Sequence, residues 1–260
     1  IFCCINSFFV SACYCTKLSH VFVFLFIKIG YKISINTNKF MSIFRILTSS
    51  IGKKVLMATT GLLLSFFMVF HLFGNLFLFV SEEAFNSYVG KLNYFKPLVR
   101  VAEFFLVLFV FSHAYTGISL WWNNRKAKQK SESYSKINTP QAARTASITG
   151  SFIFIFLITH WATFWYKFNF EKPESYYQVV IGNEVGFGNM FFSVFYIIAI
   201  ALLGYHLKHG FVSAGQTLGI KGTKYEKLYT GISSLFWLWI PLGFISIPVW
   251  FGFISPAVHP

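Results

Sequence analysis

Five stretches of about 20 or more mostly apolar residues recur along the 260-residue chain. At a helical rise of about 1.5 Å per residue, each can cross a hydrocarbon layer about 30 Å thick. Alternating β periodicity is absent, which argues against a membrane barrel. The composition agrees, since 55% of the residues are hydrophobic, 12% are charged and none is Asp. We therefore predict an all-α integral membrane bundle of five transmembrane helices, at 55–80, 98–122, 145–168, 188–214 and 228–255.

The formal net charge of +14 is concentrated in three of the segments that flank the predicted spans. The positive-inside rule places such segments in the cytoplasm, so the charge needs no nucleic-acid partner. The alternate segments, 81–97 and 169–187, contain most of the glutamates and are expected outside. We predict a multi-pass protein of a bacterial cytoplasmic membrane, with its N-terminus inside and its C-terminus outside. The basic residues are Arg45, Lys53, Lys54, Arg125, Lys126, Lys128, Lys130, Lys136, Arg144, Lys221, Lys224 and Lys227.

The first 40 residues differ from the remainder. All four cysteines lie within residues 1–15, so no disulfide, iron–sulfur cluster or covalent haem motif is expected in the bundle. The segment contains no acidic residue and has no amphipathic order. We expect residues 1–40 to be a non-native or dispensable extension, Met41 to be the biological start, and 41–260 to form the membrane domain. A signal peptide is the alternative, although no small-residue cleavage site follows the apolar stretch at 21–27.

Four histidines lie one in each of the first four spans: His71, His113, His160 and His206. An ionisable side chain is costly in hydrocarbon, so each needs a partner inside the bundle. Counting helical rise from the span ends puts His71 and His160 roughly 22–24 Å from the inner edge, and His113 and His206 roughly 13 Å from it. Two pairs at depths about 10 Å apart predict two bis-histidine metal centres stacked across the membrane.

Haem suits such centres better than zinc. Two imidazoles at one level, without Cys, Asp or a nearby Glu, cannot complete a tetrahedral zinc site, whereas haem brings four nitrogens of its own. A single histidine of this kind would more often form a hydrogen bond within the bundle, but four matched in depth favour ligation. Gly117 and Gly210 each follow a histidine by four positions and lie on the same helix face as that histidine. The absence of a side chain there would let the edge of a porphyrin lie against the helix. Close helix packing is their alternative role, and that of Gly61 and Gly150.

Three other polar residues in or near the spans have open interpretations. Arg144 either meets porphyrin propionates at the cytoplasmic rim or only sets the topology at a helix start. His209, three residues after His206, is expected at the aqueous interface and not as a ligand. Glu103, near the outer end of the second span, either takes part in proton uptake or reaches the interface.

The strings MVFHLFGN, SHAYTG, ITHWATFW and GYHLKHG contain histidines separated by 42, 47 and 46 positions. In this order they resemble the four ligand segments of the five-helix, dihaem cytochrome b subunit of succinate dehydrogenase and fumarate reductase. The resemblance covers roughly 41–255 and includes EAFNS at 83–87. It implies that His71 and His160 bind a distal haem b, and that His113 and His206 bind a proximal haem b.

The same resemblance implies a membrane-anchor subunit that transfers electrons without being itself the catalytic subunit. An FAD-containing flavoprotein and an iron–sulfur protein would dock on its cytoplasmic face. Electrons would pass between the iron–sulfur chain and a quinone, expected to be menaquinone, near the distal haem. The chain departs from relatives with a Glu two positions before the fourth histidine, since Gly204 stands there, and no proton route is carried over.

Two other functions stay open at this stage. The chain is alternatively the cytochrome b anchor of another respiratory complex, such as a hydrogenase or formate dehydrogenase, whose histidines are distributed differently among the helices. A haem-free transporter or structural membrane protein is the third interpretation, with the histidines in proton relay or packing. A reduced-minus-oxidised visible spectrum separates this last possibility from the first two.

Overall fold

The computed structural model describes the backbone of residues 49–129 and 141–255, and the side chains of 49–126 and 145–255. The chain divides into two compact units, Ile1–Gly52 and Lys53–Pro260. The first unit is described only from Ser49 onward, where Ser49 Oγ accepts the Gly52 N–H at 3.0 Å and caps the start of a helix. The expected extension 1–40 and the expected start at Met41 lie outside the described residues.

The described part of the chain is helical and contains no strand. Five helical segments are long and apolar enough to cross a membrane: Ser50–Phe79, Lys96–Lys126, Thr145–Glu171, Met190–Thr217 and Glu226–Ile254. They confirm the predicted five-helix all-α bundle, with ends that differ from the predicted ones by a few residues. The chain is therefore a multi-pass membrane protein.

These segments and their connections are built from α-helices with short 3-10 or π-helical pieces. The first span is α2 (Ser50–Leu76) with η1 (Phe77–Phe79), and α3 (Glu82–Tyr94) joins it to α4 (Lys96–Gln129). The third span is α5 (Gln141–His160) with the π-helical η2 (Trp161–Trp165) and η3 (Lys167–Glu171), followed by α6 (Tyr176–Ile181) and the fourth span, α7 (Met190–Thr217). The last span is α8 (Glu226–Ser234), η4 (Leu235–Trp239), α9 (Ile240–Val249) and η5 (Trp250–Ile254).

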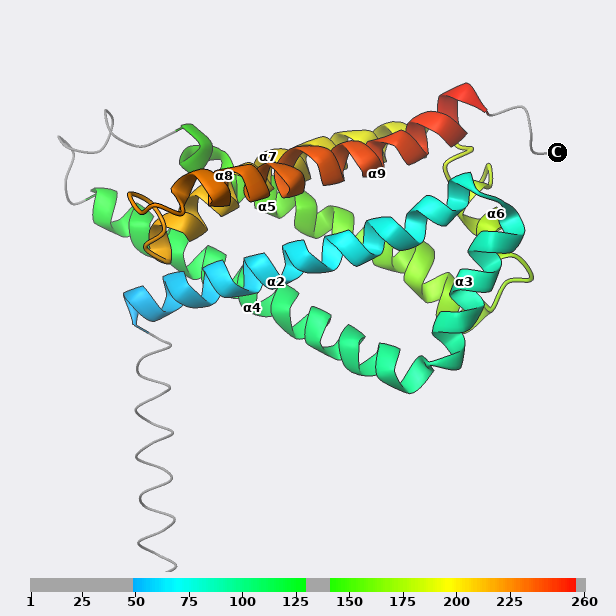
Figure 1. Cartoon of the computed structure of the whole chain (residues 1–260), viewed down its shortest axis with the longest axis horizontal. Helices are drawn as coiled ribbons and strands as arrows, with labels where there is room; N and C mark the ends of the chain where they lie inside the picture. The colour runs from blue at the N-terminus through cyan, green and yellow to red at the C-terminus, as the bar shows by residue number, and fades with distance from the viewer. Residues whose placement is uncertain (1–48, 130–140, 256–260) are drawn as a thin grey trace, which may run out of the picture. The chain divides into compact units, whose positions relative to one another are not determined.

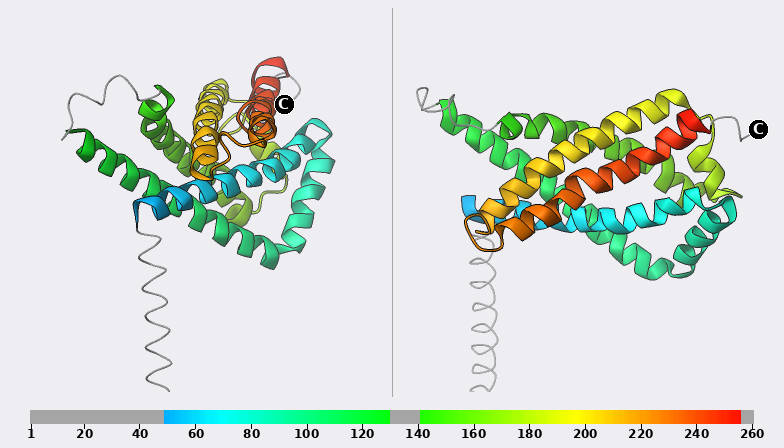
Figure 2. Two further views of the ribbon diagram at one scale, coloured as in Figure 1. Left: turned by 60° about the vertical axis from the view of Figure 1, so that its left-hand side comes forward. Right: turned by 45° about the horizontal axis from the view of Figure 1, so that its top comes forward.

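The first four spans form two helical hairpins in the second unit (Figure 1). In the first hairpin, Lys53 Nζ on α2 donates to Ser119 Oγ on α4 at 2.8 Å. In the second hairpin, α7 packs along α5 (Figures 1 and 2), and the Thr145 hydroxyl donates to Tyr205 OH at 3.3 Å. Helix α9 lies beside α7, as the right-hand view of Figure 2 shows. Connecting helices α3 and α6 lie at the same end of the bundle.

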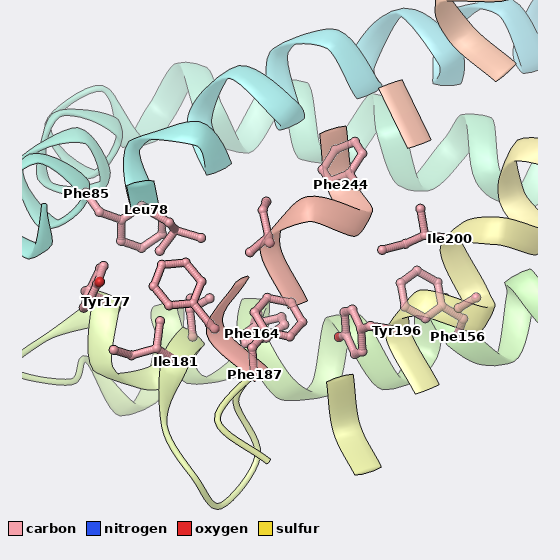
Figure 3. Close-up of a cluster of buried hydrophobic side chains, with 14 of the residues drawn as sticks. Leu78, Phe85, Phe156, Phe164, Tyr177, Ile181, Phe187, Tyr196, Ile200 and Phe244 are labelled. Atoms are coloured by element: carbon pink, nitrogen blue, oxygen red, sulfur yellow. The ribbon is translucent and has the colours of Figure 1, made fainter. Parts of the chain in front are cut away.

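Burial differs between the two ends of the bundle. A mostly aromatic core extends from the α3–α6 end to the middle of the spans (Figure 3); its labelled members are Leu78, Phe85, Phe156, Phe164, Tyr177, Ile181, Phe187, Tyr196, Ile200 and Phe244. Towards the other end, the buried side chains include small polar ones, among them Thr60, Thr116 and Thr149. Many large apolar side chains of the spans are exposed, for example Phe104 at 65% and Phe191 at 86%, as expected of faces that contact lipid.

The segments expected only as outer loops contain the short helices α3 and α6. Ser81 caps α3 by accepting the Ala84 N–H at 3.1 Å, and two glutamates occupy its first turn. Asn86 fastens α3 to α6, because its Oδ1 accepts the Tyr177 N–H at 3.0 Å while its Nδ2 donates to Ser175 Oγ at 3.0 Å. The EAFNS segment therefore holds the two connecting helices together at this end of the bundle.

Candidate functional site

His71 on α2 and His160 on α5 lie against each other. Their ring centroids are 5.7 Å apart, and the ring planes are inclined by 87°. His71 stacks on Phe67 and lies 5.4 Å from the ring of Phe244. His160 contacts Phe156, Phe164 and Tyr196. We call His71 and His160 the 71–160 couple; aromatic side chains surround it.

His113 on α4 and His206 on α7 form a second couple, the 113–206 couple. Their ring centroids are 6.2 Å apart, with planes inclined by 76°. Both couples therefore take one histidine from each hairpin. The pairs are the same ones that helical counting grouped by depth.

The two couples are separated along the bundle by ten positions on each of three helices. Gly61 faces the ring of His113 and precedes His71 by ten positions, while Gly150 faces the ring of His206 and precedes His160 by ten. Tyr196, which contacts His160, precedes His206 by ten. Ten helical residues span about 15 Å. Counting depth from the span ends had predicted about 10 Å, and the difference reflects the levels chosen for those ends.

Hydrogen bonds orient both rings of the 113–206 couple. His113 Nδ1 lies 3.2 Å from the Met57 carbonyl oxygen and 3.3 Å from Thr60 Oγ1. His206 Nδ1 lies 3.3 Å from Thr149 Oγ1. Because a carbonyl oxygen can only accept, His113 Nδ1 carries the proton, and its Nε2 keeps the lone pair.

The 71–160 couple has different polar partners. His160 Nδ1 lies 3.3 Å from the Tyr196 hydroxyl, which is buried in the core. His71 Nδ1 lies 3.5 Å from Asn75 Nδ2, whose stronger bond is a 2.7 Å donation to the His71 carbonyl. The π-helical turn η2 begins directly after His160, and such turns are frequent at functional sites.

Gly61 and Gly150 face the rings of the 113–206 couple, and the sequence predicted only helix packing for them. A Cβ on Gly61 would lie 3.0 Å from His113 Cε1, and one on Gly150 would lie 3.5 Å from His206 Cε1. The available signal was a Thr-Gly pair whose glycine stands ten positions before a histidine on both α2 and α5. Gly117 instead lies near Met57, and a Cβ on Gly210 would meet open space.

Arg144 and His209, which the sequence also singled out, belong to neither couple in the described structure. Arg144 lies in the first turns of α5, but its side chain falls outside the described residues. His209 is partly buried on α7 and belongs to neither couple.

Glu103 belongs to a polar network on the flank of α4. Its Oε2 accepts from Arg100 Nη1 at 2.6 Å and its Oε1 accepts from Trp165 Nε1 at 2.9 Å. Arg100 also donates to Asn169 Oδ1 at 2.9 Å. These side chains border an open groove of about 330 Å³ with mainly apolar walls, lined by Arg100, Glu103, Phe104, Leu106, Val107, Trp161 and Trp165.

The donor set of each couple fits an iron that already has four planar ligands. An imidazole nitrogen binds a first-row metal at about 2 Å and the ring centre lies about 1 Å behind it, so two imidazoles on opposite sides of one iron have centroids about 6 Å apart. The observed 5.7 and 6.2 Å allow this spacing, and they also lie in the range of direct T-shaped ring contacts. In the described structure, no three His, Cys, Asp or Glu side chains gather into a metal-binding group.

Comparison with known proteins identifies no relative of this chain. No protein-family model matches the chain. Searches of the curated proteins and of the solved structures find no match either.

Proposed function

We propose that the chain is the membrane-anchor cytochrome b subunit of a succinate:quinone oxidoreductase and transfers electrons without being the catalytic subunit. The observation that supports this proposal best is the pair of facing imidazole couples. In each couple the two imidazoles lie close enough to hold one metal ion between them, and each couple is formed between the two hairpins. In this proposal, His71 and His160 hold one haem b, and His113 and His206 hold the other.

Haem, when bound, supplies a one-electron redox centre at each couple. The two histidines of each couple would hold the haem through their ring nitrogens, and a haem held by two histidines would serve electron transfer rather than bond chemistry. Phe67, Phe156, Phe164 and Phe244 exclude water around the 71–160 couple. Thr60 and Thr149 orient the rings of the 113–206 couple. Two couples about 15 Å apart form a path along the bundle.

The basic end of the bundle supports a docking face for soluble partners. The start of α2, the end of α4 and the α7–α8 connection lie at the end opposite α3 and α6 (Figure 1). The positive-inside rule assigns this end to the cytoplasm. We propose that the flavoprotein with FAD and the iron–sulfur subunit dock there, beside the 113–206 couple. The described basic residues at this end are Lys53, Lys54, Arg125, Lys126, Lys221, Lys224 and Lys227.

The groove beside Glu103 supports exchange of a lipid-soluble quinone, with menaquinone as the expected one. Trp161 lines the groove and directly follows His160, so the groove adjoins the helix turn that holds the 71–160 couple. Apolar walls suit an isoprenoid quinone, and the Arg100–Glu103 pair offers polar atoms to its carbonyl oxygens. The groove is open, and exposed Phe104 lies at its edge, so it is reachable from the bilayer.

Visible spectroscopy of the purified, full-length protein with its co-purified partners tests the proposal. We expect a reduced-minus-oxidised spectrum with two b-type components, about two haems per chain, and succinate-dependent reduction of both. H206A should remove the component of the 113–206 couple. H209A is the matched control, since it changes a histidine of the same helix outside both couples, and it should keep both components.

The alternatives give different results in the same preparation. A flat difference spectrum would overturn the proposal in favour of a haem-free transporter or structural protein. Two b-type components reduced by hydrogen or formate, but not by succinate, would assign the chain to another respiratory complex.

A further inference from the structure

The two hairpins repeat one arrangement of Thr, Gly and His. In α2, Thr60 and Gly61 precede His71 and contact His113 of the partner helix α4. In α5, Thr149 and Gly150 precede His160 and contact His206 of the partner helix α7. Both glycines stand ten positions before the histidine on their own helix. The two rings of the 113–206 couple are therefore held by equivalent residues of a repeated hairpin.

We propose that Thr60 and Thr149 are positioning residues, which hold the two imidazoles of the 113–206 couple with Nδ1 as donor and Nε2 directed to a metal. The proposal rests on the proposed haem-binding function and extends it to residues outside the ligand set. Gly61 belongs to the same device, because it leaves room for the edge of the His113 ring against the helix backbone, whereas a Cβ on Gly150 would make only an ordinary contact with His206.

The direction of the hydrogen bonds between the threonines and the rings follows from the acceptor to which each threonine hydroxyl donates. Thr60 Oγ1 donates to the Leu56 carbonyl at 2.7 Å, and Thr149 Oγ1 lies 3.1 Å from the Ala146 carbonyl and 3.2 Å from the Thr145 carbonyl. A hydroxyl has one proton, so the oxygen that gives it to a carbonyl can only accept from the ring. Both threonines are at most 5% exposed, so water does not replace this bond.

A hydrogen bond of this kind affects both the geometry and the chemistry of a metal ligand. It fixes the tautomer and the rotation of the ring, and it makes the coordinating nitrogen more basic. A more basic ligand stabilises the oxidised iron, so removal of the bond raises the midpoint potential. Loss of such outer partners lowers metal affinity by about 10- to 100-fold.

The two threonines are not equally necessary to their rings. His113 Nδ1 also has the Met57 carbonyl at 3.2 Å, whereas among the described residues Thr149 is the partner of His206 Nδ1. Replacement of Thr149 therefore leaves Nδ1 without an acceptor, and replacement of Thr60 does not. We expect a larger effect of T149V than of T60V.

Thr116 provides a matched control. It is 2% exposed and donates to the Ser112 carbonyl at 2.7 Å, with the His113 carbonyl at 3.1 Å, so it forms the same bonds to the preceding helical turn. Its hydroxyl forms no hydrogen bond to either ring of the couple in the described structure. T116V therefore removes a buried, back-bonded hydroxyl without removing a bond to Nδ1.

The test uses the full chain with its partners and compares T149V, T149S, T60V and T116V with the parent protein. The readouts are the low-spin haem resonances in electron paramagnetic resonance, a potentiometric titration of each b-type component, and the affinity of the haem-depleted protein for added haem. T149V should change the resonance and raise the potential of one component only, and should weaken haem binding at that couple by about 10- to 100-fold. T149S should restore the parent values, T60V should lie between, and T116V should match the parent.

The outcomes distinguish this inference from the proposed function. If the parent protein shows no b-type component, the proposed function fails and the positioning roles fail with it. If the parent shows two components but T149V and T116V behave alike, the positioning role alone is refuted. Equal shifts of both components in T149V also refute it, because Thr149 contacts one couple only.

Discussion

Under the proposed function, replacement of Gly61 by Ala should disturb the 113–206 couple through a single methyl group. The new Cβ would lie 3.0 Å from His113 Cε1 and 3.4 Å from His113 Nδ1. Ordinary carbon contacts begin near 3.4 Å, so the ring must retreat by about 0.4 Å. Backbone on either side of Gly61 is helical, and its φ is not positive, so alanine is compatible with the backbone itself.

The shift is small, but the bonds that hold His113 are already long. Its contacts with Met57 O and Thr60 Oγ1 are 3.2 and 3.3 Å, and a retreat of about 0.4 Å from α2 extends both to or beyond roughly 3.6 Å, where no hydrogen bond remains. Overpacking costs about 1–3 kcal/mol, partly offset by about 1 kcal/mol from the better helix propensity of alanine. The protein should therefore fold, while haem affinity at the 113–206 couple falls by about 10- to 100-fold.

G150A is the matched control for this change. It adds the same methyl group at the equivalent place in the second hairpin, but there the Cβ would lie 3.5 Å from His206 Cε1, an ordinary contact. Haem titration of the depleted protein, followed by optical spectra of each component, measures both variants. G61A should lose affinity at one couple and keep the other, and G150A should match the parent. Equal affinities for G61A and the parent, or equal losses in both variants, would refute the steric argument.

Two further predictions test the groove and the packing of the bundle. E103Q should raise the KM for a menaquinol analogue about tenfold, because it removes the negative charge that holds Arg100, and both b-type components should persist. E184Q changes a glutamate outside this network and is the control. An unchanged KM in E103Q would exclude the groove as the quinone site. G252A should destabilise the protein by about 1–3 kcal/mol, because its Cβ would lie 2.8 Å from Ser193 Cβ and 3.0 Å from the Phe187 carbonyl oxygen. G90A has open space around its Cβ and should stabilise α3 by about 0.5–1 kcal/mol. Thermal unfolding in detergent measures both glycine variants, and a stability of G252A equal to that of G90A would contradict the packing.

The spans were predictable because hydropathy and length are local properties of the sequence. The grouping of His71 with His160, and of His113 with His206, needed only alternating helix direction and a constant rise per residue. Those quantities do not depend on how each helix is rotated about its axis. Sequence counting therefore found the two pairs without knowing which residues face inward.

Contacts between helices were not accessible in the same way. Thr60 and Gly61 contact His113 because α2 presents that face to α4, and nothing in the local sequence of α2 specifies this rotation. The Thr-Gly pairs at matched distances from His71 and His160 were visible as a repeat, but their partners lie more than 50 positions away. The helix α3 was missed for another reason, since hydropathy does not report helix capping. Ser81 followed by two glutamates is a signal for the start of a helix that depends on capping and not on hydropathy.

The division of ligands between hairpins has a consequence for assembly. Each couple takes one histidine from α2 or α4 and one from α5 or α7, so a group held by both members of a couple joins the two hairpins. Ligand binding that is confined to the folded arrangement stabilises it by mass action. Loss of one couple still leaves the hairpins joined through the other, about 15 Å along the bundle. Under the proposed function, loss of a ligand at one couple should therefore leave partial occupancy of the other. Loss of both couples should weaken the packing of the hairpins, which stay joined through Asn86 of α3 and Arg100 of α4, and should lower the yield of the complex with the soluble partners.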